Sequence, residues 1–164
     1  SPMCYAARIA KEKYPDAKIV FVGPCVAKRK EAQRDEAVDF VMTFEEISSI
    51  FDAFEVNLEI VQPYAMEFSS VREAHGFAQA GGVMGAVKAF LKMEADKINA
   101  IQVSDLNKKN IGTLRAYAKS GKAPGQFIEV MACEGGCITG PSTHSGSNGK
   151  RQLVQELAKQ EKTY

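Results

Sequence analysis

Two cysteines sit four positions apart in the stretch EVMACEGGCITG, residues 129–140. Cys133 and Cys137 are separated by a pair of glycines, Gly135 and Gly136, which let the backbone curl without a Cβ clash. Glycines also let main-chain N–H groups approach an anion or a sulfide. Two thiols in a Gly-rich turn are typical of a ligand site rather than of ordinary packing.

A third cysteine, Cys25, lies more than a hundred residues earlier, directly after the apolar run AKIVFVG at residues 17–23. Cys133 follows the similar run GQFIEVMA at residues 125–132. Functional residues collect just beyond the carboxyl ends of strands in open parallel sheets, so we expect the three thiols to converge on one edge. Cys25 taken alone is more simply read as a buried core cysteine.

The spacing of the cysteines bears on the kind of metal. Thiolates favour zinc or iron–sulfur clusters, and zinc sites usually bring Cys-x-x-Cys knuckles, which this chain lacks. Widely separated cysteines suit a cluster held between loops. A catalytic Cys25 would need a histidine partner; His75 and His144 are the two available, and both are expected at the surface.

Three further residues lie beside these cysteines. Lys28 comes three positions after Cys25 and Glu31 three after that, so an ammonium could face an anionic ligand there. Met131 precedes Cys133 by two positions, which places both side chains on one face of a strand. The alternatives are a solvated basic stretch for Lys28 and Glu31, and core packing for Met131.

Composition and charge narrow the class of protein. The 164 residues carry 21 basic and 20 acidic side chains, and 45% of the residues are hydrophobic. This balance predicts no nucleic-acid partner, and no apolar run approaches the ~20 residues of a membrane span. There is no charged-then-apolar leader, and the clustered cysteines suggest metal chemistry, so we expect a cytoplasmic protein. Because the chain starts at Ser1 without methionine, we expect it to be an excised piece.

The elements that must position these residues alternate between short strands and helices. Short apolar runs predict strands at residues 17–23, 38–43, 98–103 and 125–132. Helical spacing predicts helices at residues 2–14, 44–54, 81–94, 106–121 and 150–162, the second opened by a capping box of Thr43 and Glu46. We expect one α/β domain over residues 1–164, with a mostly parallel four-stranded sheet flanked by helices.

At this point the motifs resemble those of the [FeFe]-hydrogenases. GPCVAKRKE (23–31) resembles their Pro-Cys-x-x-Lys-x-x-Glu motif, and EVMACEGGC (129–137) resembles Glu-x-Met-x-Cys-x-x-Gly-Cys. GFAQAGGVM (76–84) and SPM (1–3) are similar to two further segments of the family. The resemblance covers most of the chain in the same order, and it implies one lobe of the iron-only hydrogenase fold.

The resemblance also implies a ligand set. The family binds the H-cluster, a [4Fe–4S] cubane joined through one cysteine to a di-iron unit that carries CO and cyanide. By motif match, Cys25 and Cys133 would ligate the cubane, and Cys137 would bridge it to the di-iron unit. Lys28 would hydrogen-bond a cyanide, with Glu31 completing that motif as a candidate catalytic residue. The reaction implied is the reversible reduction of protons to H₂.

The resemblance places four more residues around the cofactor. Ser1 and Pro2 would lie near the di-iron ligands, and Phe77 and Met131 would form apolar walls. A further family motif, Thr-Ser-Cys-Cys-Pro, is missing, and Cys4 is expected to pack rather than replace it. We therefore expect the isolated chain to carry no intact H-cluster and to evolve no H₂.

The partners implied are the missing N-terminal lobe of the same chain and either a ferredoxin-like electron donor or an attached sensor domain. Two alternatives to a catalytic hydrogenase follow from the same residues. One is a hydrogenase-like iron–sulfur assembly factor that binds only a [4Fe–4S] cluster. The other is an H₂-sensing signalling module, which the departure at Gly85, where the family has glutamate, also favours. Lys28 and Met131 favour the hydrogenase over the assembly factor.

Overall fold

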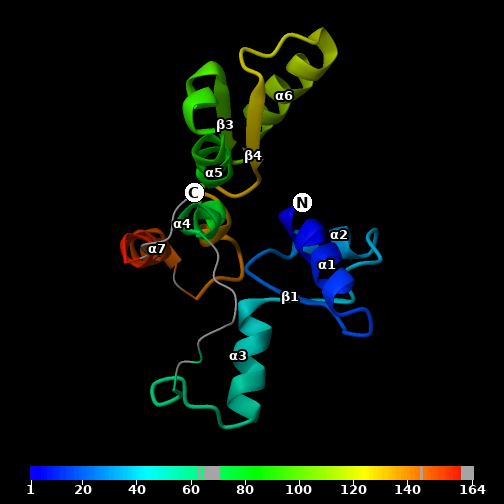
Figure 1. The fold of residues 1–164 in the computed structure, drawn as a ribbon, viewed down its shortest axis with the longest axis vertical. Coiled ribbons are helices and arrows are strands. Elements are labelled where there is room, and N and C mark those ends of the chain that lie inside the picture. The colour runs from blue at the N-terminus through cyan, green and yellow to red at the C-terminus, as the bar shows by residue number, and fades with distance from the viewer. Residues whose placement is uncertain (63, 65–70, 145, 160–164) are drawn as a thin grey trace. The chain divides into compact units, whose positions relative to one another are not determined.

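The computed structural model describes residues 1–62, 64, 71–144 and 146–159 (Figure 1). The α-helices and strands, in chain order, are α1 (Pro2–Lys13), β1 (Val20–Val22), α2 (Ala27–Ala32), β2 (Phe40–Met42), α3 (Phe44–Ala53), α4 (Arg72–His75), α5 (Gly82–Leu91), β3 (Ala100–Ser104), α6 (Lys108–Ser120), β4 (Phe127–Met131) and α7 (Gly149–Ala158). The 3₁₀ turns are η1 (Gly76–Ala78), η2 (Lys92–Lys97), η3 (Cys137–Thr139) and η4 (Gly146–Asn148).

The predicted α/β class with parallel strands is confirmed, but its sheet is divided. In the described residues β1 pairs with β2 and β3 pairs with β4, both in parallel, as two two-stranded sheets. The expectation of one four-stranded sheet is corrected accordingly. Parallel strands need a crossover of a dozen or more residues, and α2 and α6 each supply one. In each sheet the first strand thus pairs with the second across a single helix.

The chain divides into two compact units. The N-terminal unit comprises Ser1–Tyr64 with Pro141–His144, and the C-terminal unit comprises Ala65–Gly140 with Ser145–Tyr164. Each unit contains one of the two sheets. That the units act as one domain stays a prediction.

The core of the N-terminal unit lies between α1 and one face of its sheet. Met3, Cys4 and Ala7 share a face of α1 and are buried. They pack with buried Val38 and half-buried neighbours on and beside the strands, namely Ile19, Phe21, Ala32, Ala37 and Val41. Side chains alternate along a strand, so Val20, Val22 and Phe40 point the other way and are exposed.

Helix α3 begins where the sequence predicts it. The Thr43 side chain accepts a hydrogen bond from the Glu46 N–H at 3.2 Å, and the Thr43 N–H donates to Glu46 Oε2 at 2.7 Å. The predicted capping box is therefore confirmed. Ser48 on this helix lies 3.0 Å from Nε2 of exposed His144, which ties residues 141–144 to the N-terminal unit.

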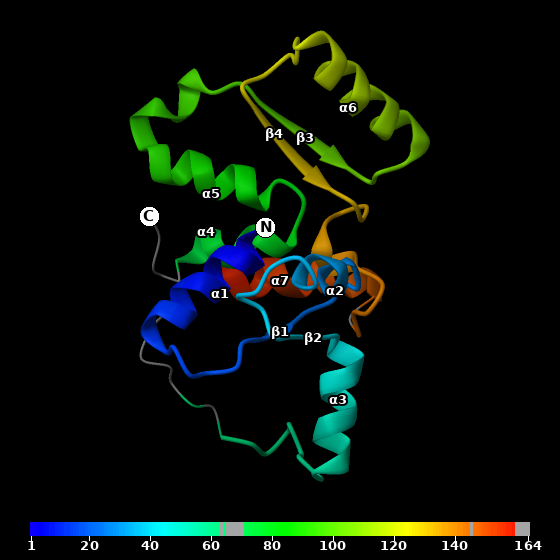
Figure 2. The same cartoon turned by 90° about the vertical axis from the view of Figure 1, so that its right-hand side faces the viewer.

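The C-terminal unit is built around β3 and β4, with α5 and α6 on either side of them (Figure 2). Helix α6 begins at Asn107, whose side chain accepts from the Asn110 N–H at 2.9 Å, and it ends at Gly121 with φ 65°. Gly121 thus ends the helix in the left-handed conformation that favours glycine, within the predicted range 106–121. No helix in the described part of the chain is long and apolar enough to cross a membrane.

Two stretches are more regular than the sequence pattern indicates. For CVAKRKEAQRDE the pattern predicts a loop or an irregular helical turn, and the structure has the six-residue helix α2 there. The polar pattern of residues 66–82 predicts a loop; these residues fall partly outside the described ones, and their described part contains α4 and η1. Both elements are too short for a helical periodicity to be visible in the sequence.

Candidate functional site

Cys25 lies just after β1, where the chain turns into α2. The Gly23 N–H donates to the Met42 carbonyl at 3.0 Å, so the chain is still held to β2 two residues before the cysteine. The Lys28 N–H donates to the Cys25 carbonyl at 3.2 Å, so Cys25 forms the first turn that leads into α2. Cys25 is half-buried, and Lys28 follows it on the same turn. The structure thus confirms Cys25 as a strand-end residue.

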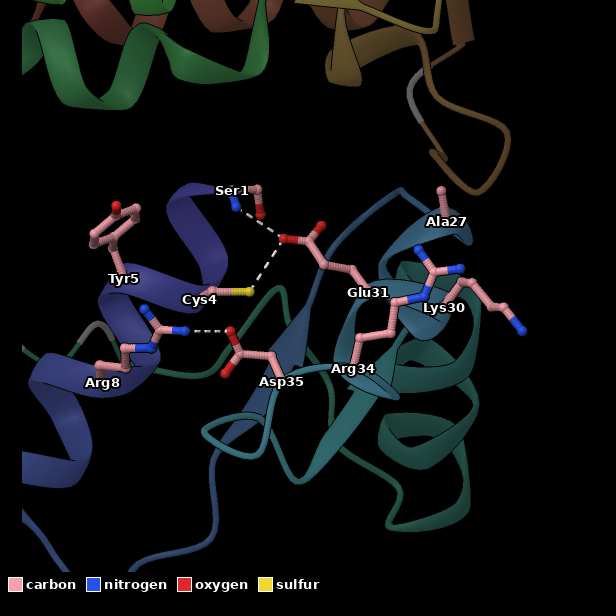
Figure 3. Close-up of a pocket in the computed structure, with 9 residues that line it drawn as sticks. All are labelled: Ser1, Cys4, Tyr5, Arg8, Ala27, Lys30, Glu31, Arg34 and Asp35. Carbon is pink, nitrogen blue, oxygen red and sulfur yellow. Dashed lines mark hydrogen bonds and ion pairs between the residues drawn. The ribbon is translucent and has the colours of Figure 1, made fainter.

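The carboxylate of Glu31 contacts Lys28, Ser1 and Cys4, the last two of which are drawn in Figure 3. Its Oε2 lies 2.6 Å from Lys28 Nζ, and its Oε1 lies 2.9 Å from the Ser1 nitrogen. The Cys4 thiol donates to the same Oε1 at 3.1 Å. Pro2 contributes by starting α1 in its first turn, where its missing N–H is not needed. Glu31 therefore joins α1 to α2.

The network shifts two pKa values in opposite directions. Partial burial opposes the charge on Glu31, but hydrogen bonds from Lys28, Ser1 and Cys4 outweigh it and hold the pKa of Glu31 far below its usual range. The pKa of the Cys4 thiol is raised, first by its hydrogen bond to Glu31 and then by burial. Cys4 is therefore a neutral donor, and Glu31 is a fixed anion.

A groove of about 430 Å³ opens between α1 and α2 beside this network (Figure 3). Arg8 and Asp35 form an ion pair of 2.9 Å on its wall. Cys4, which also lines the groove, is buried in the core as the sequence predicts. Its hydrogen bond to Glu31 is not foreseen by the sequence analysis. Cys4 and Glu31 are 27 residues apart, so no local pattern in the sequence indicates this bond.

The Cys133–Cys137 loop of the C-terminal unit starts two residues after β4. The Gly136 N–H donates to the Cys133 carbonyl at 3.1 Å, and Cys137 opens η3. Gly135 and Gly136 have φ values of 81° and 101°, in the region that favours glycine. The expected curl of the backbone between the two cysteines is confirmed. Both cysteines are half-buried.

The η1 segment packs against this loop. A Cβ on Gly136 would lie 2.4 Å from the Ala80 nitrogen and 2.8 Å from the Ala78 carbonyl oxygen, so the two backbones touch. The Ala80 N–H donates to the Gly135 carbonyl at 3.0 Å. Phe77, half-buried in η1, immediately precedes this contact, and Met131 is the half-buried last residue of β4. Their roles as walls of a cofactor site stay a prediction.

Two polar residues of the C-terminal unit were missed by the sequence analysis. Glu129 in β4 is only 5% exposed, and its carboxylate accepts from the Gly81 N–H at 2.6 Å and the Met84 N–H at 2.7 Å. Ser104 at the end of β3 accepts from the Gly135 N–H at 2.9 Å. A charged residue inside the apolar strand FIEVM, near a helix that opens on two glycines, is the signal for Glu129. Ser104 carries no such signal.

The donors present fit an iron–sulfur cluster by their chemistry. None of the four cysteines, all within the described residues, forms a disulfide. Cys25 belongs to the N-terminal unit, whereas Cys133 and Cys137 belong to the C-terminal unit. Over the described residues, no three His, Cys, Asp or Glu side chains are gathered so as to hold a metal ion. The meeting of all three thiols at one cluster therefore stays a prediction.

A cysteine at the end of a parallel strand in one unit, and a Gly-rich cysteine pair at the end of a parallel strand in the other, define an α/β protein with thiols at its strand ends. The chain matches the family model of the iron only hydrogenase large subunit, C-terminal domain, over residues 1–141. The chain belongs to this family.

Solved structures share the fold. An [FeFe]-hydrogenase studied for oxygen inactivation of its H cluster matches with a TM-score of 0.64 and 19% identity, over 99% of this chain and 59% of that one. A variant of [FeFe]-hydrogenase HydA1 from Chlamydomonas reinhardtii matches with a TM-score of 0.60 and 20% identity, over 94% of this chain and 58% of that one. At such identities these similarities support the fold alone.

Two curated relatives carry names other than hydrogenase. The chain is 28% identical to the nuclear prelamin A recognition factor of Danio rerio, over 84% of this chain and 39% of that protein. It is also 28% identical to the cytosolic Fe-S cluster assembly factor narfl of Danio rerio, over 87% of this chain and 46% of that protein. The chain thus spans less than half the length of these two relatives.

Proposed function

We propose that this chain is the C-terminal, cluster-binding part of a hydrogenase-like iron–sulfur protein of the cytosolic assembly-factor kind. The observation that carries the proposal is the pair of strand-end cysteine turns, Cys25 on one unit and Cys133 with Cys137 on the other, in a member of this family. Curated relatives named as cytosolic Fe-S cluster assembly factors support this kind over a catalytic hydrogenase.

In this proposal Cys25, Cys133 and Cys137 would hold a [4Fe–4S] cluster, and the remaining ligand would come from outside the chain. The cluster would supply electron storage or a transferable iron–sulfur unit. Lys28 has three N–H donors, one of which faces Glu31, so the others would remain available to an anionic sulfide or ligand. The partner implied is the N-terminal portion of a longer protein, with a ferredoxin-like donor or a sensor domain as the further expectations.

The test is anaerobic reconstitution of the full 164-residue chain, and of a longer parent protein, with ferrous iron and sulfide. We expect iron and sulfide to bind to the parent in the ratio of a [4Fe–4S] cluster. Cys25→Ser, Cys133→Ser and Cys137→Ser should each lower the bound iron. Cys4→Ser is the matched control and should leave the iron content unchanged. Unchanged iron content in Cys25→Ser would remove this residue from the site, and unchanged content in all three would overturn the proposal.

The second candidate is a hydrogenase with the complete H-cluster, and one specific observation favours it. Lys28 and Met131 match the hydrogenase motifs beside Cys25 and Cys133. Infrared spectra of the parent, expressed with the maturation proteins of a hydrogenase, separate the two candidates. Stretching bands of CO and cyanide would support the hydrogenase, and a loaded cubane without such bands would support the assembly factor. We expect the isolated chain to evolve no H₂ in either case.

A further inference from the structure

The loop that carries Cys133 and Cys137 is fastened from the neighbouring strand. Ser104 is the last residue of β3 and is in register with Met131, the last residue of β4. Its hydroxyl accepts from the Gly135 N–H at 2.9 Å and lies 3.4 Å from the Cys133 carbonyl oxygen, to which it donates. One hydroxyl therefore holds both the start and the middle of the cysteine turn.

Glu129 holds the same loop indirectly, through the start of helix α5. Helix α5 begins at Gly82 after Gly81, and glycine has no side chain with which to cap the exposed N–H groups of the first turn. The carboxylate of Glu129, which lies in β4, caps this end of α5 instead, since it accepts hydrogen bonds from the Gly81 and Met84 N–H groups. A negative charge is also favourable at this end of a helix.

The cap at Gly81 fixes the residue that reaches the cysteine turn. Ala80, one position before Gly81, donates its N–H to the Gly135 carbonyl. Gly135 is thus bonded through its N–H to Ser104 and through its carbonyl to Ala80. Both backbone polar groups of Gly135 are therefore hydrogen-bonded, and the adjoining Gly136 has no room for a Cβ against residues 78–80. These contacts fix the position of the cysteine turn within the C-terminal unit.

We propose that Ser104 and Glu129 are positioning residues, which hold Cys133 and Cys137 side by side in a ligand-ready arrangement before any metal binds. The identity of that ligand as an iron–sulfur cluster rests on the proposed function, but the preformed thiol pair does not. Holding two donors in place beforehand removes the ordering that binding would otherwise require, which raises the affinity for any ligand that must bridge them.

The probe is phenylarsine oxide, which needs two neighbouring thiols and no iron. Each thiol replaces one As–O bond by an As–S bond, and the two thiol protons leave with the oxide oxygen as water, so no oxidant or reductant is consumed. The full chain, without iron, is titrated in competition with a small dithiol. Peptide mapping by mass spectrometry then identifies which cysteines the arsenic bridges.

The decisive variant is Ser104→Ala. It deletes the hydroxyl that holds the turn, and we expect the affinity of the Cys133–Cys137 pair for the arsenical to fall about fivefold, as one lost hydrogen bond predicts. Ser104→Thr retains the hydroxyl and should restore most of the affinity. Glu129→Gln places an amide N–H₂ group against backbone donors and should lower the affinity at least as much.

The matched control is Ser120→Ala in the same unit. The Ser120 hydroxyl also donates to a carbonyl at 3.4 Å, that of Tyr117, and accepts from an N–H at 3.2 Å, that of Lys122. It lies at the end of α6 and not on the cysteine turn, so its loss should leave the arsenical affinity unchanged. Far-ultraviolet circular dichroism checks that each variant is folded, and Ser104→Ala keeps the test open if Glu129→Gln does not fold.

The outcomes separate the inference from the proposed function. A bridge between Cys133 and Cys137 that weakens in Ser104→Ala and not in Ser120→Ala supports the inference, whether or not the parent takes up iron. No bridge in the wild-type chain, or equal affinity in wild type and Ser104→Ala, overturns the inference. Iron uptake by the parent would then leave the proposed function standing alone.

Discussion

The segments next to the cysteines are held by different kinds of interaction in the two units. In the N-terminal unit the helix that follows Cys25, α2, is joined to α1 by polar side-chain contacts, with Glu31 bonded to Lys28, Cys4 and Ser1. In the C-terminal unit the turn around Cys133 is held by hydrogen bonds to backbone groups and by backbone contact at Gly136. Side-chain ion pairs respond to pH and salt, whereas packed backbone does not. The helix after Cys25 therefore has an ionic contact that pH and salt can weaken, whereas the Cys133 turn lies against packed backbone.

The largest effect that this comparison predicts is at Gly136. Gly136→Ala would place a Cβ 2.4 Å from the Ala80 nitrogen at a φ of 101°, and neither backbone can give way. We expect the free energy of unfolding of the C-terminal unit to fall by about 3 kcal/mol, from overpacking and backbone strain together. Urea unfolding followed by circular dichroism measures it.

Gly121→Ala provides the control for this prediction. Gly121 also has a positive φ, 65°, but an added Cβ would meet nothing within 4 Å. Only the conformational strain remains, so the loss should be about 1 kcal/mol. Equal losses in the two variants would mean that the close backbone contact does not hold the cysteine turn.

The next-largest expected effect concerns the ion pair of Glu31 with Lys28, which we call the ionic support. Glu31→Gln removes the anion that Lys28 and Cys4 face, and we expect a loss of about 1 kcal/mol in the N-terminal unit after allowance for its partial exposure. The loss should shrink in high salt, which screens the pair in the wild type. Glu156→Gln, which breaks the exposed 2.6 Å pair with Lys159, should have almost no effect. A salt-independent loss in Glu31→Gln would contradict an ionic support.

Acid should weaken the same network in a gentler way. The pKa of Glu31 is lowered in the folded state, so its contribution is complete above the ordinary glutamate pKa of about 4.3. Stability should fall as the pH decreases from there toward the lower pKa of the folded state. Hydrogen exchange of the α1 and α2 amides between pH 6 and pH 3, referred to the intrinsic rate at each pH, measures it. In Glu31→Gln this part of the acid response should be absent.

The smallest predicted effect is a difference in alkylation rate among the cysteines. The pKa of Cys4 is raised and the residue is 5% exposed, so little thiolate is available to react. At pH 8 iodoacetamide should modify Cys4 about tenfold more slowly than the half-buried Cys25 and Cys133. Mass spectrometry of timed samples measures the rates, and the difference should vanish in urea. Equal rates in the folded chain would show that the Glu31 contact does not retain the thiol proton.

Local sequence signals predict most of the secondary structure. The helices over α1, α3, α5, α6 and α7 and the four strands all fall within a few residues of their expected positions. Their signals are local, namely the capping box at Thr43, the glycine stop at Gly121 and short apolar runs. The division into two sheets was not predicted, because strand pairing depends on contacts between distant segments rather than on local pattern.

The candidate site is likewise predictable only where its signals are local in the sequence. Motif spacing marks Cys25, Cys133 and Cys137 as strand-end residues, and Lys28 and Glu31 as neighbours on one turn. The hydrogen bonds of Cys4, Ser104 and Glu129 connect segments 27 to 48 residues apart, and no spacing rule reports such pairs. Of these three residues only Glu129 has a sequence signal, since a carboxyl side chain in a buried strand requires hydrogen-bond partners.

The contact of Gly136 with residues 78–80 has a consequence for mutational drift. The atoms that meet there are main-chain atoms, which every amino acid at positions 78, 79 and 80 supplies. Side chains on that segment can be exchanged over generations while the shape of the cysteine turn is inherited unchanged. Gly136 cannot be replaced without a clash, and proline is excluded at position 80 because it lacks the N–H that Ala80 donates to Gly135. A contact of this type constrains the path of the cysteine turn without constraining the side chains of the segment that it touches.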